Sequence, residues 1–198
     1  MKTIEYYYDF ASPNAYLVHK LLPGIAAAHG AGLVYRPALL GGIFKATNNT
    51  PPMVAFAGVS NKVDYMRIEI ARFQERYGLE LRWNTHFPVN TVMAMRAAVH
   101  AIGQDWESAF IDAMFEATWT HGLNIGDAAL VHGVLAEHGL PADDIAAAVQ
   151  DQAIKDKLRD LTDAAVARKV FGMPTMFVGT EMFFGKDSLN WLEWELQK

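Results

Sequence analysis

Strand-forming sequence occurs near the two ends of this chain and nowhere else, and this distribution limits the folds that the chain can adopt. Residues 3–9 are rich in Ile and Tyr and lead into Ser12-Pro13, a typical helix N-cap followed by a proline that suits the first helical turn. Apolar residues recur at helical spacing over 14–30, and residues 33–37 have the composition of a short strand. The opening therefore predicts a strand–helix–strand unit with parallel strands.

The second strand-forming region lies close to the C-terminus. Residues 175–178 and 182–184 flank Gly179-Thr180-Glu181, a pattern typical of a β-hairpin. Asp187-Ser188 is expected to cap a last helix over residues 189–196. The chain should therefore end in a strand–strand–helix unit.

Between these two regions, nearly every segment shows helical periodicity or helix-ending residues. The expected helices are Lys62–Tyr77, Thr91–Gly103, Asp105–His121, Asp127–His138, Ala142–Gln150 and Ala153–Lys169. We predict an α/β fold in which a βαβ…ββα core, residues 1–42 and 170–198, is interrupted by an all-helical insertion over residues 43–169.

Composition and charge argue against several classes of function. The net charge is -5, and Lys and Arg are spread over several helical faces, so we expect no nucleic acid partner. No stretch approaches the roughly 20 apolar residues that cross a bilayer, and Glu5 and Asp9 interrupt the N-terminus before a signal-peptide core could form. We expect a cytoplasmic protein with no membrane partner. The histidines never fall in a metal-binding spacing, so no metal site is predicted.

Ser12 stands where a strand ends and a helix begins. Free backbone N–H groups and the positive end of the helix dipole meet at such a point, which favours an anion such as a thiolate. An ordinary serine cap explains the same residues, and spacing alone favours that simpler interpretation. The chain contains no cysteine, which excludes disulfides, dithiol redox chemistry and cysteine nucleophiles.

Met173-Pro174 immediately precedes the expected hairpin. Proline is tolerated at the entrance to a strand because its missing N–H is then not needed by the sheet. Taken alone, it is typical of an ordinary strand start. Together with Ser12 at the start of a helix, however, it gives a thioredoxin-like arrangement interrupted by helices.

With this arrangement, the sequence resembles the family of 2-hydroxychromene-2-carboxylate isomerases and kappa-class glutathione transferases, which is itself similar to the DsbA-type thiol oxidoreductases. The resemblance covers essentially the whole chain and depends on five ordered motifs. They are Tyr7-Tyr8-Asp9-Phe10-Ala11-Ser12-Pro13-Asn14-Ala15-Tyr16, Asn49-Thr50-Pro51-Pro52, Phe87-Pro88-Val89-Asn90, Phe171-Gly172-Met173-Pro174-Thr175 and Phe183-Phe184-Gly185-Lys186-Asp187-Ser188-Leu189.

The resemblance implies a glutathione site. Ser12 is similar to the serine that donates a hydrogen bond to the glutathione sulfur, at the position where redox relatives carry a cysteine. Met173, before a Pro174 in the cis form, is similar to the segment that pairs with the cysteinyl unit of glutathione. Asp187 and Ser188 resemble the pair that holds the γ-glutamyl end.

Four further positions complete the predicted site. Asn49 and Lys62 match, less closely, residues that contact the other end of the tripeptide. Asn14 and Asn90 are predicted to contact the substrate, although an asparagine before a helix, as at Asn90, is also a common cap.

The activity that the resemblance implies is a glutathione-dependent isomerisation of a small aromatic carboxylate of the 2-hydroxychromene type, through reversible addition of the thiolate to a conjugated double bond. Two alternatives stay open. One is kappa-type transfer, in which the glutathione conjugate leaves as product. The other is a non-catalytic, cysteine-less relative of the DsbA type. Relatives are often dimers, so a homodimer is expected.

Overall fold

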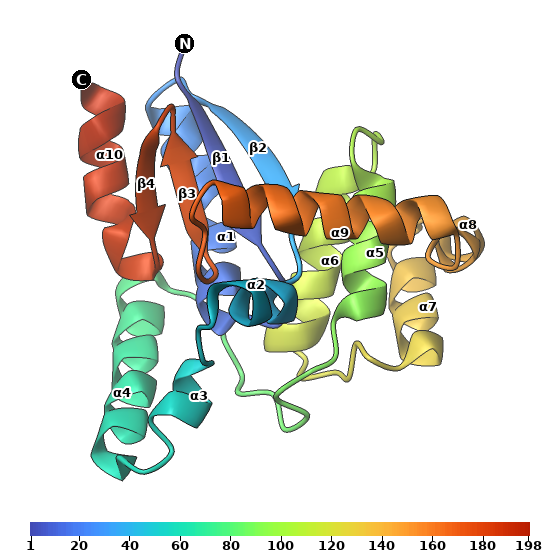
Figure 1. The fold of residues 1–198 in the computed structure, drawn as a ribbon, viewed down its shortest axis with the longest axis horizontal. Coiled ribbons are helices and arrows are strands. Elements are labelled where there is room, and N and C mark those ends of the chain that lie inside the picture. The colour runs from blue at the N-terminus through green and yellow to red at the C-terminus, as the bar shows by residue number, and fades with distance from the viewer.

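The computed structural model describes residues 1–198 as an α/β structure, shown in Figure 1. Its four strands are β1 (Thr3–Tyr8), β2 (Gly32–Pro37), β3 (Thr175–Val178) and β4 (Glu181–Phe184). The helices are α1 (Pro13–Ala28), α2 (Leu40–Thr47), α3 (Pro52–Ala55), α4 (Ser60–Tyr77), α5 (Val92–Ala101), α6 (Glu107–Trp119), α7 (Ala128–Glu137), α8 (Ala142–Ala148), α9 (Gln152–Ala167), the 3₁₀ turn η1 (Lys186–Ser188) and α10 (Leu189–Gln197). No helix is long and apolar enough to cross a membrane.

The two ends of the chain build one sheet in the order β2-β1-β3-β4. β1 and β2 pair in parallel, with Tyr6 opposite Tyr35, whereas β3 pairs antiparallel to both β1 and β4. The predicted βαβ and ββα units are confirmed, and the α/β fold with a helical insertion is confirmed with them. Residues far apart in sequence thus lie side by side in the centre of the sheet.

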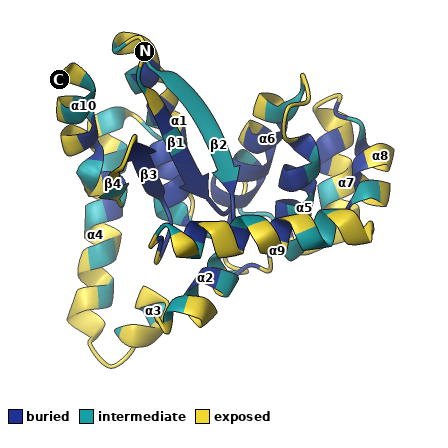
Figure 2. Cartoon of the chain, turned by 45° about the horizontal axis from the view of Figure 1, so that its top comes forward, coloured by how far each residue is buried: buried dark blue, intermediate teal, exposed yellow.

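The hydrophobic core runs without a break from the sheet into the helical insertion. One cluster of 37 buried residues includes Ile4 on β1, Leu17 on α1, Met95 on α5 and Phe115 on α6. Figure 2 shows the central strands buried, whereas much of α4 and the outer face of α9 are exposed. The two-part division at residues 42/43 and 169/170 stays a prediction, and its first boundary falls inside α2.

Three local features differ from the expectation or add to it. α2 and α3 form within a stretch where the sequence predicts no individual helix. The Met173–Pro174 bond is cis, as the resemblance implied, and Phe87–Pro88 is cis as well. Ser188 occupies the N-cap position of α10, as expected, but its side chain makes no capping bond, because its hydroxyl donates to the carbonyl of Gly185 at 2.8 Å, just before η1.

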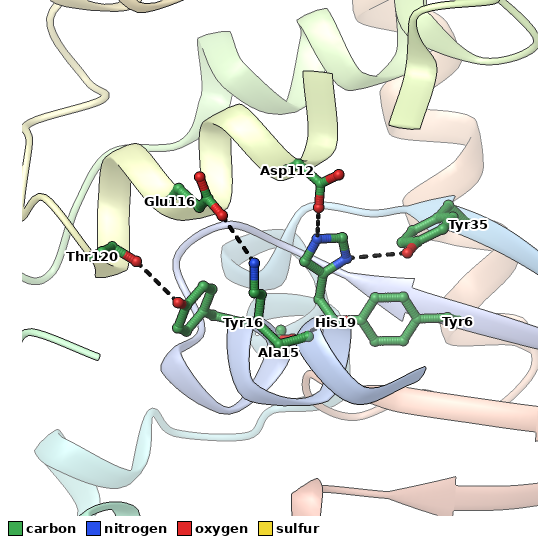
Figure 3. A network of polar contacts seen from close by, with 9 residues as sticks. Tyr6, Ala15, Tyr16, His19, Tyr35, Asp112, Glu116 and Thr120 are labelled. Atoms are coloured by element: carbon green, nitrogen blue, oxygen red, sulfur yellow. Dashed lines mark hydrogen bonds and ion pairs between the residues drawn. The ribbon is translucent and has the colours of Figure 1, made fainter. Parts of the chain in front are cut away.

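A buried histidine joins α1 to the insertion. His19 is 3% exposed, and its Nε2 lies 2.7 Å from Asp112 Oδ1 on α6, while its Nδ1 lies 3.1 Å from the Tyr35 hydroxyl on β2. Its ring stacks on Phe115. Figure 3 shows these partners on either side of the imidazole. The helix that begins after Ser12 is therefore held against both the sheet and α6.

We expect Asp112→Asn to lower the free energy of unfolding at neutral pH by about 1 kcal/mol or less, since half of this carboxylate is exposed. The hydrogen bond from His19 lowers the pKa of Asp112 below its ordinary value of 3.8, against the opposing effect of burial. An acid whose pKa is lower in the folded state than in the unfolded state stabilises the folded state at pH values above its ordinary pKa. This contribution is lost as the pH falls through the folded-state pKa.

Urea unfolding at a series of pH values checks this prediction, with Asp144→Asn as control because Asp144 pairs with His100 but is 67% exposed. The difference between wild type and Asp112→Asn should disappear in acid. A difference in the free energy of unfolding that persists at the lowest pH would contradict a stabilising role of the ionised Asp112 carboxylate.

Candidate functional site

The turn between β1 and α1 and the segment before β3 meet at Ser12. The Ser12 side chain is 5% exposed and caps α1, because its Oγ accepts a hydrogen bond from the Ala15 N–H at 3.1 Å. The same hydroxyl donates to the carbonyl of Met173 at 3.1 Å. Two predicted site segments, 161 positions apart in the sequence, are thereby in direct contact.

The backbone around Met173 leaves one group free. The Met173 carbonyl accepts from Ser12, but the Met173 N–H has no acceptor within the chain. The next carbonyl, that of Pro174, accepts from the Gly185 N–H at 3.0 Å. A short extended peptide could pair with Met173 through its free N–H, in the manner of an added strand.

A buried carboxylate beneath this turn organises the site. Asp9 is 1% exposed, and its Oδ1 accepts from the Ala11 N–H at 2.9 Å and from the Thr91 hydroxyl at 2.7 Å. Its Oδ2 accepts from the Leu40 N–H at 2.7 Å. Burial raises the pKa of Asp9 above its ordinary value, and the three hydrogen bonds oppose that rise. Asp9 therefore ties the Ser12 turn to the beginnings of both α2 and α5.

The sequence alone indicates no role for Asp9, although the residue lies in the motif that contains Ser12. The available signal is an acidic residue directly after a strand that ends in three tyrosines. Its three partners come from different parts of the chain, so the local sequence could not identify them.

Asn49 and Asn14 lie close to these segments. The Asn49 Nδ2 donates to the Phe171 carbonyl at 2.8 Å, which attaches the loop between α2 and α3 to the residues just before Met173. Asn14 is the second residue of α1, and its Oδ1 is buried without a hydrogen-bond partner. An unpaired buried amide oxygen is uncommon in folded proteins.

Asp187 and Ser188 follow β4, next to the Pro174–Gly185 contact. The Asp187 side chain is 76% exposed, and its Oδ1 lies 2.6 Å from the ammonium of Lys186, which is 6% exposed. Lys186 lies in the last of the five motifs, but the sequence alone indicates no role for it. A carboxylate with a buried cation on one side and solvent on the other can accept further hydrogen bonds from a ligand.

The two remaining predicted residues, Lys62 and Asn90, form their side-chain contacts away from Ser12 and Met173. Lys62 lies in the first turn of α4, where its ammonium is 3.5 Å from the centre of the Phe56 ring, and Figure 1 shows this turn at the end of α4 farther from the sheet. Asn90 is exposed, and its Oδ1 accepts from the Val92 N–H at 3.1 Å, as a local helix-start residue does. Contacts of either side chain with a ligand stay a prediction.

Three aromatic rings pack beside the Ser12 turn. Trp119 is fully buried, and its Nε1 donates to the Phe10 carbonyl at 2.8 Å. Trp83 and Phe87, which are only partly buried, pack on Trp119 with ring centres 6.2 and 6.1 Å from it. An aromatic surface of this kind can stack with a planar ligand.

Comparison with known proteins gives matches over nearly the whole chain. A family model described as a DSBA-like thioredoxin domain matches residues 3–197. The chain is 32% identical over 192 residues to the 2-hydroxychromene-2-carboxylate isomerase of Sphingobium xenophagum, covering 97% of this chain and 96% of that protein. It is 26% identical to glutathione S-transferase kappa 1 of Rattus norvegicus, covering 98% of this chain and 91% of the transferase.

A solved structure shares nearly the whole fold. The structure of a 2-hydroxychromene-2-carboxylate isomerase superposes with a TM-score of 0.87 at 27% identity, over 98% of this chain and 94% of that one. These relatives are isomerases and transferases, and their similarity extends from β1 to α10.

Proposed function

Because this chain belongs to the DsbA-like thioredoxin family and its full-length relatives include isomerases and glutathione transferases, we propose that it is a glutathione-dependent isomerase of small aromatic carboxylates of the 2-hydroxychromene type. The observation that carries the proposal is the contact of the Ser12 hydroxyl with the Met173 carbonyl, beside a free Met173 N–H.

The residues at this site fit a tripeptide thiol. Met173 offers one free N–H to a peptide carbonyl. Asp187 offers an exposed carboxylate to an ammonium group, while the buried ammonium of Lys186 lies beside it. Asn49, Lys62 and Ser188 are the further residues that we propose to hold glutathione. When bound, glutathione supplies a thiolate that can add to a conjugated double bond and leave again without net redox change.

Ser12 has the role of holding a negative sulfur at the start of α1. Its single hydroxyl proton points to the neutral Met173 carbonyl in this structure. A sulfur anion is a stronger acceptor than a neutral carbonyl, so the hydroxyl should turn towards it. Each unit by which the site lowers the thiol pKa corresponds to about 1.4 kcal/mol of preference for the thiolate.

An aromatic substrate is proposed to bind against Trp83 and Phe87, which are partly buried and pack on Trp119. Asn14, the second residue of α1, is the further residue that we propose to contact the substrate. These contacts would orient the double bond towards the sulfur.

The proposal is tested by incubating the full chain with glutathione and 2-hydroxychromene-2-carboxylate. We expect the absorbance of the substrate to change while its mass stays the same, and omission of glutathione should abolish the change. A stable adduct with the added mass of glutathione would identify a transferase instead. A reaction that proceeds equally without glutathione would overturn the proposal.

Thermal unfolding with glutathione separates both enzymes from a non-catalytic relative. A ligand present at 100 times its Kd stabilises the folded state by about 2.7 kcal/mol, so the melting temperature should rise. Ophthalmic acid, which replaces the thiol of glutathione by a methyl group, is the matched control. Absence of any shift with glutathione would favour the binding protein.

A further inference from the structure

A cleft of about 520 Å³ lies between α2, α5 and α9, apart from the predicted glutathione and substrate residues. In Figures 1 and 2 α9 crosses close to α2, with α5 behind it. The charged residues that line the cleft are four cations and one carboxylate: Lys45, Arg96, Lys155, Arg159 and Asp163. None of the residues assigned above to glutathione or to the substrate lines it.

Three of the four cations lack an acidic partner. No carboxylate oxygen lies within 4.0 Å of the side-chain nitrogens of Lys45, Arg96 or Lys155. The contact that Arg96 makes is to the Met93 sulfur at 3.6 Å, a weak acceptor. Arg159, in contrast, pairs with Asp156 at 2.9 Å and Asp160 at 3.4 Å.

Partial burial makes this imbalance significant. Arg96 and Lys155 are both only partly exposed, whereas Lys45 and Arg159 reach solvent. Cations that line one cleft and are partly withdrawn from water repel each other, and an anion bound there is attracted more strongly than it would be at an open surface.

The walls of the cleft are held in place by contacts outside the charged groups. The Thr162 hydroxyl accepts from the Leu39 N–H at 3.0 Å and donates to the Leu158 carbonyl at 2.7 Å, which links α9 to the start of α2. Gly42 lies so close to α9 that a Cβ on it would stand 3.0 Å from the Thr162 methyl group. The cleft is therefore formed before any ligand arrives, as ligand sites usually are.

We propose that this cleft binds a small organic anion with at least two negative charges, either a polycarboxylate or a phosphate compound. Because Arg159 is already paired with Asp156 and Asp160, the lining groups left to compensate are three cations and the carboxylate of Asp163, a formal charge of +2. A singly charged ligand would leave half of this charge uncompensated. Arg96 and Lys155 bind the anionic groups directly, and Lys45 closes the open side. This site does not depend on the reaction proposed for Ser12.

The test measures binding of citrate and of pyrophosphate to the full chain by titration calorimetry, with sodium chloride adjusted to keep the ionic strength constant. We expect binding at one site, weakened at least about tenfold in the double variant Arg96→Gln and Lys155→Gln. The matched control is Arg72→Gln with Lys157→Gln, which removes two exposed cations of α4 and α9 outside the cleft and should leave binding unchanged.

The two probes also distinguish the source of the negative charge. Tighter binding of citrate assigns the cleft to a polycarboxylate, and tighter binding of pyrophosphate assigns it to a phosphate compound. If the double variant fails to fold by circular dichroism, the exposed Lys45→Gln replaces it, with Lys157→Gln alone as control. No binding of either probe at about 10 mM, or an equal loss in the control variant, would overturn the proposal.

Discussion

Replacing Ser12 by alanine is expected to lower kcat/KM for the isomerisation by about a hundredfold to a thousandfold, and the free energy of unfolding by about 1 kcal/mol. The two effects come from the two hydrogen bonds of one hydroxyl. Its oxygen accepts from the Ala15 N–H and so caps α1, which accounts for the loss of stability. Its proton, which the Met173 carbonyl accepts in this structure, is the group proposed to face the sulfur.

A variant of another helix cap in the chain distinguishes the chemical role of Ser12 from its capping role. Asp127 caps α7 by accepting from the N–H groups of Ala129 and Leu130 at 2.9 and 3.3 Å. Asp127→Ala should cost a similar amount of stability but leave turnover unchanged. The pKa of bound glutathione, followed by thiolate absorbance, should rise in Ser12→Ala and stay the same in Asp127→Ala. Equal turnover in wild type and Ser12→Ala would contradict the assignment.

The ends of the chain could be predicted from sequence because their signals are local. The Ile- and Tyr-rich strand before Ser12-Pro13 and the short strands around Gly179 carry their own periodicity and turn residues. Each expected helix of the insertion has its counterpart within a few residues, since apolar spacing and capping residues both lie inside the segment that they define.

α2 could not be predicted in the same way. It begins at Leu40-Gly41-Gly42, and its first residues offer no side-chain cap and two poor helix formers. Its beginning is held instead by distant groups, the Thr162 hydroxyl on the Leu39 N–H and the Asp9 carboxylate on the Leu40 N–H. A helix start satisfied from elsewhere in the chain leaves no local signal.

The candidate site shows the same difference between local features, which the sequence predicts, and long-range contacts, which it does not. Ser12 could be identified as the start of a helix from its neighbours, but its contact with Met173 requires the fold, and the family resemblance supplied that link in the sequence. Ser188 had the composition of a cap, yet the 3₁₀ turn directs its hydroxyl to Gly185. Trp83 and Phe87 differ little in sequence from ordinary core residues, so their position beside the turn had no separate signal.

Removal of the buried carboxylate should have the largest effect on stability. We expect Asp9→Ala to lower the free energy of unfolding by about 2–5 kcal/mol, because the N–H groups of Ala11 and Leu40 and the Thr91 hydroxyl all lose their acceptor. Since Ala11 precedes Ser12 and Leu40 begins α2, the variant should also weaken glutathione binding. Urea unfolding and titration with glutathione measure the two effects, and Asp127→Ala is again the control.

The pH dependence of this loss provides an independent check. Burial raises the pKa of Asp9 above 3.8, so the folded state binds its proton more tightly than the unfolded state does. An acid whose pKa is raised by folding contributes its full stabilisation at pH values below its ordinary pKa. This stabilisation is lost as the pH rises through the folded-state pKa. The difference between wild type and Asp9→Ala should therefore be largest in acid and shrink as the pH rises. A difference that grows with pH would show that the hydrogen bonds to the ionised carboxylate outweigh its burial.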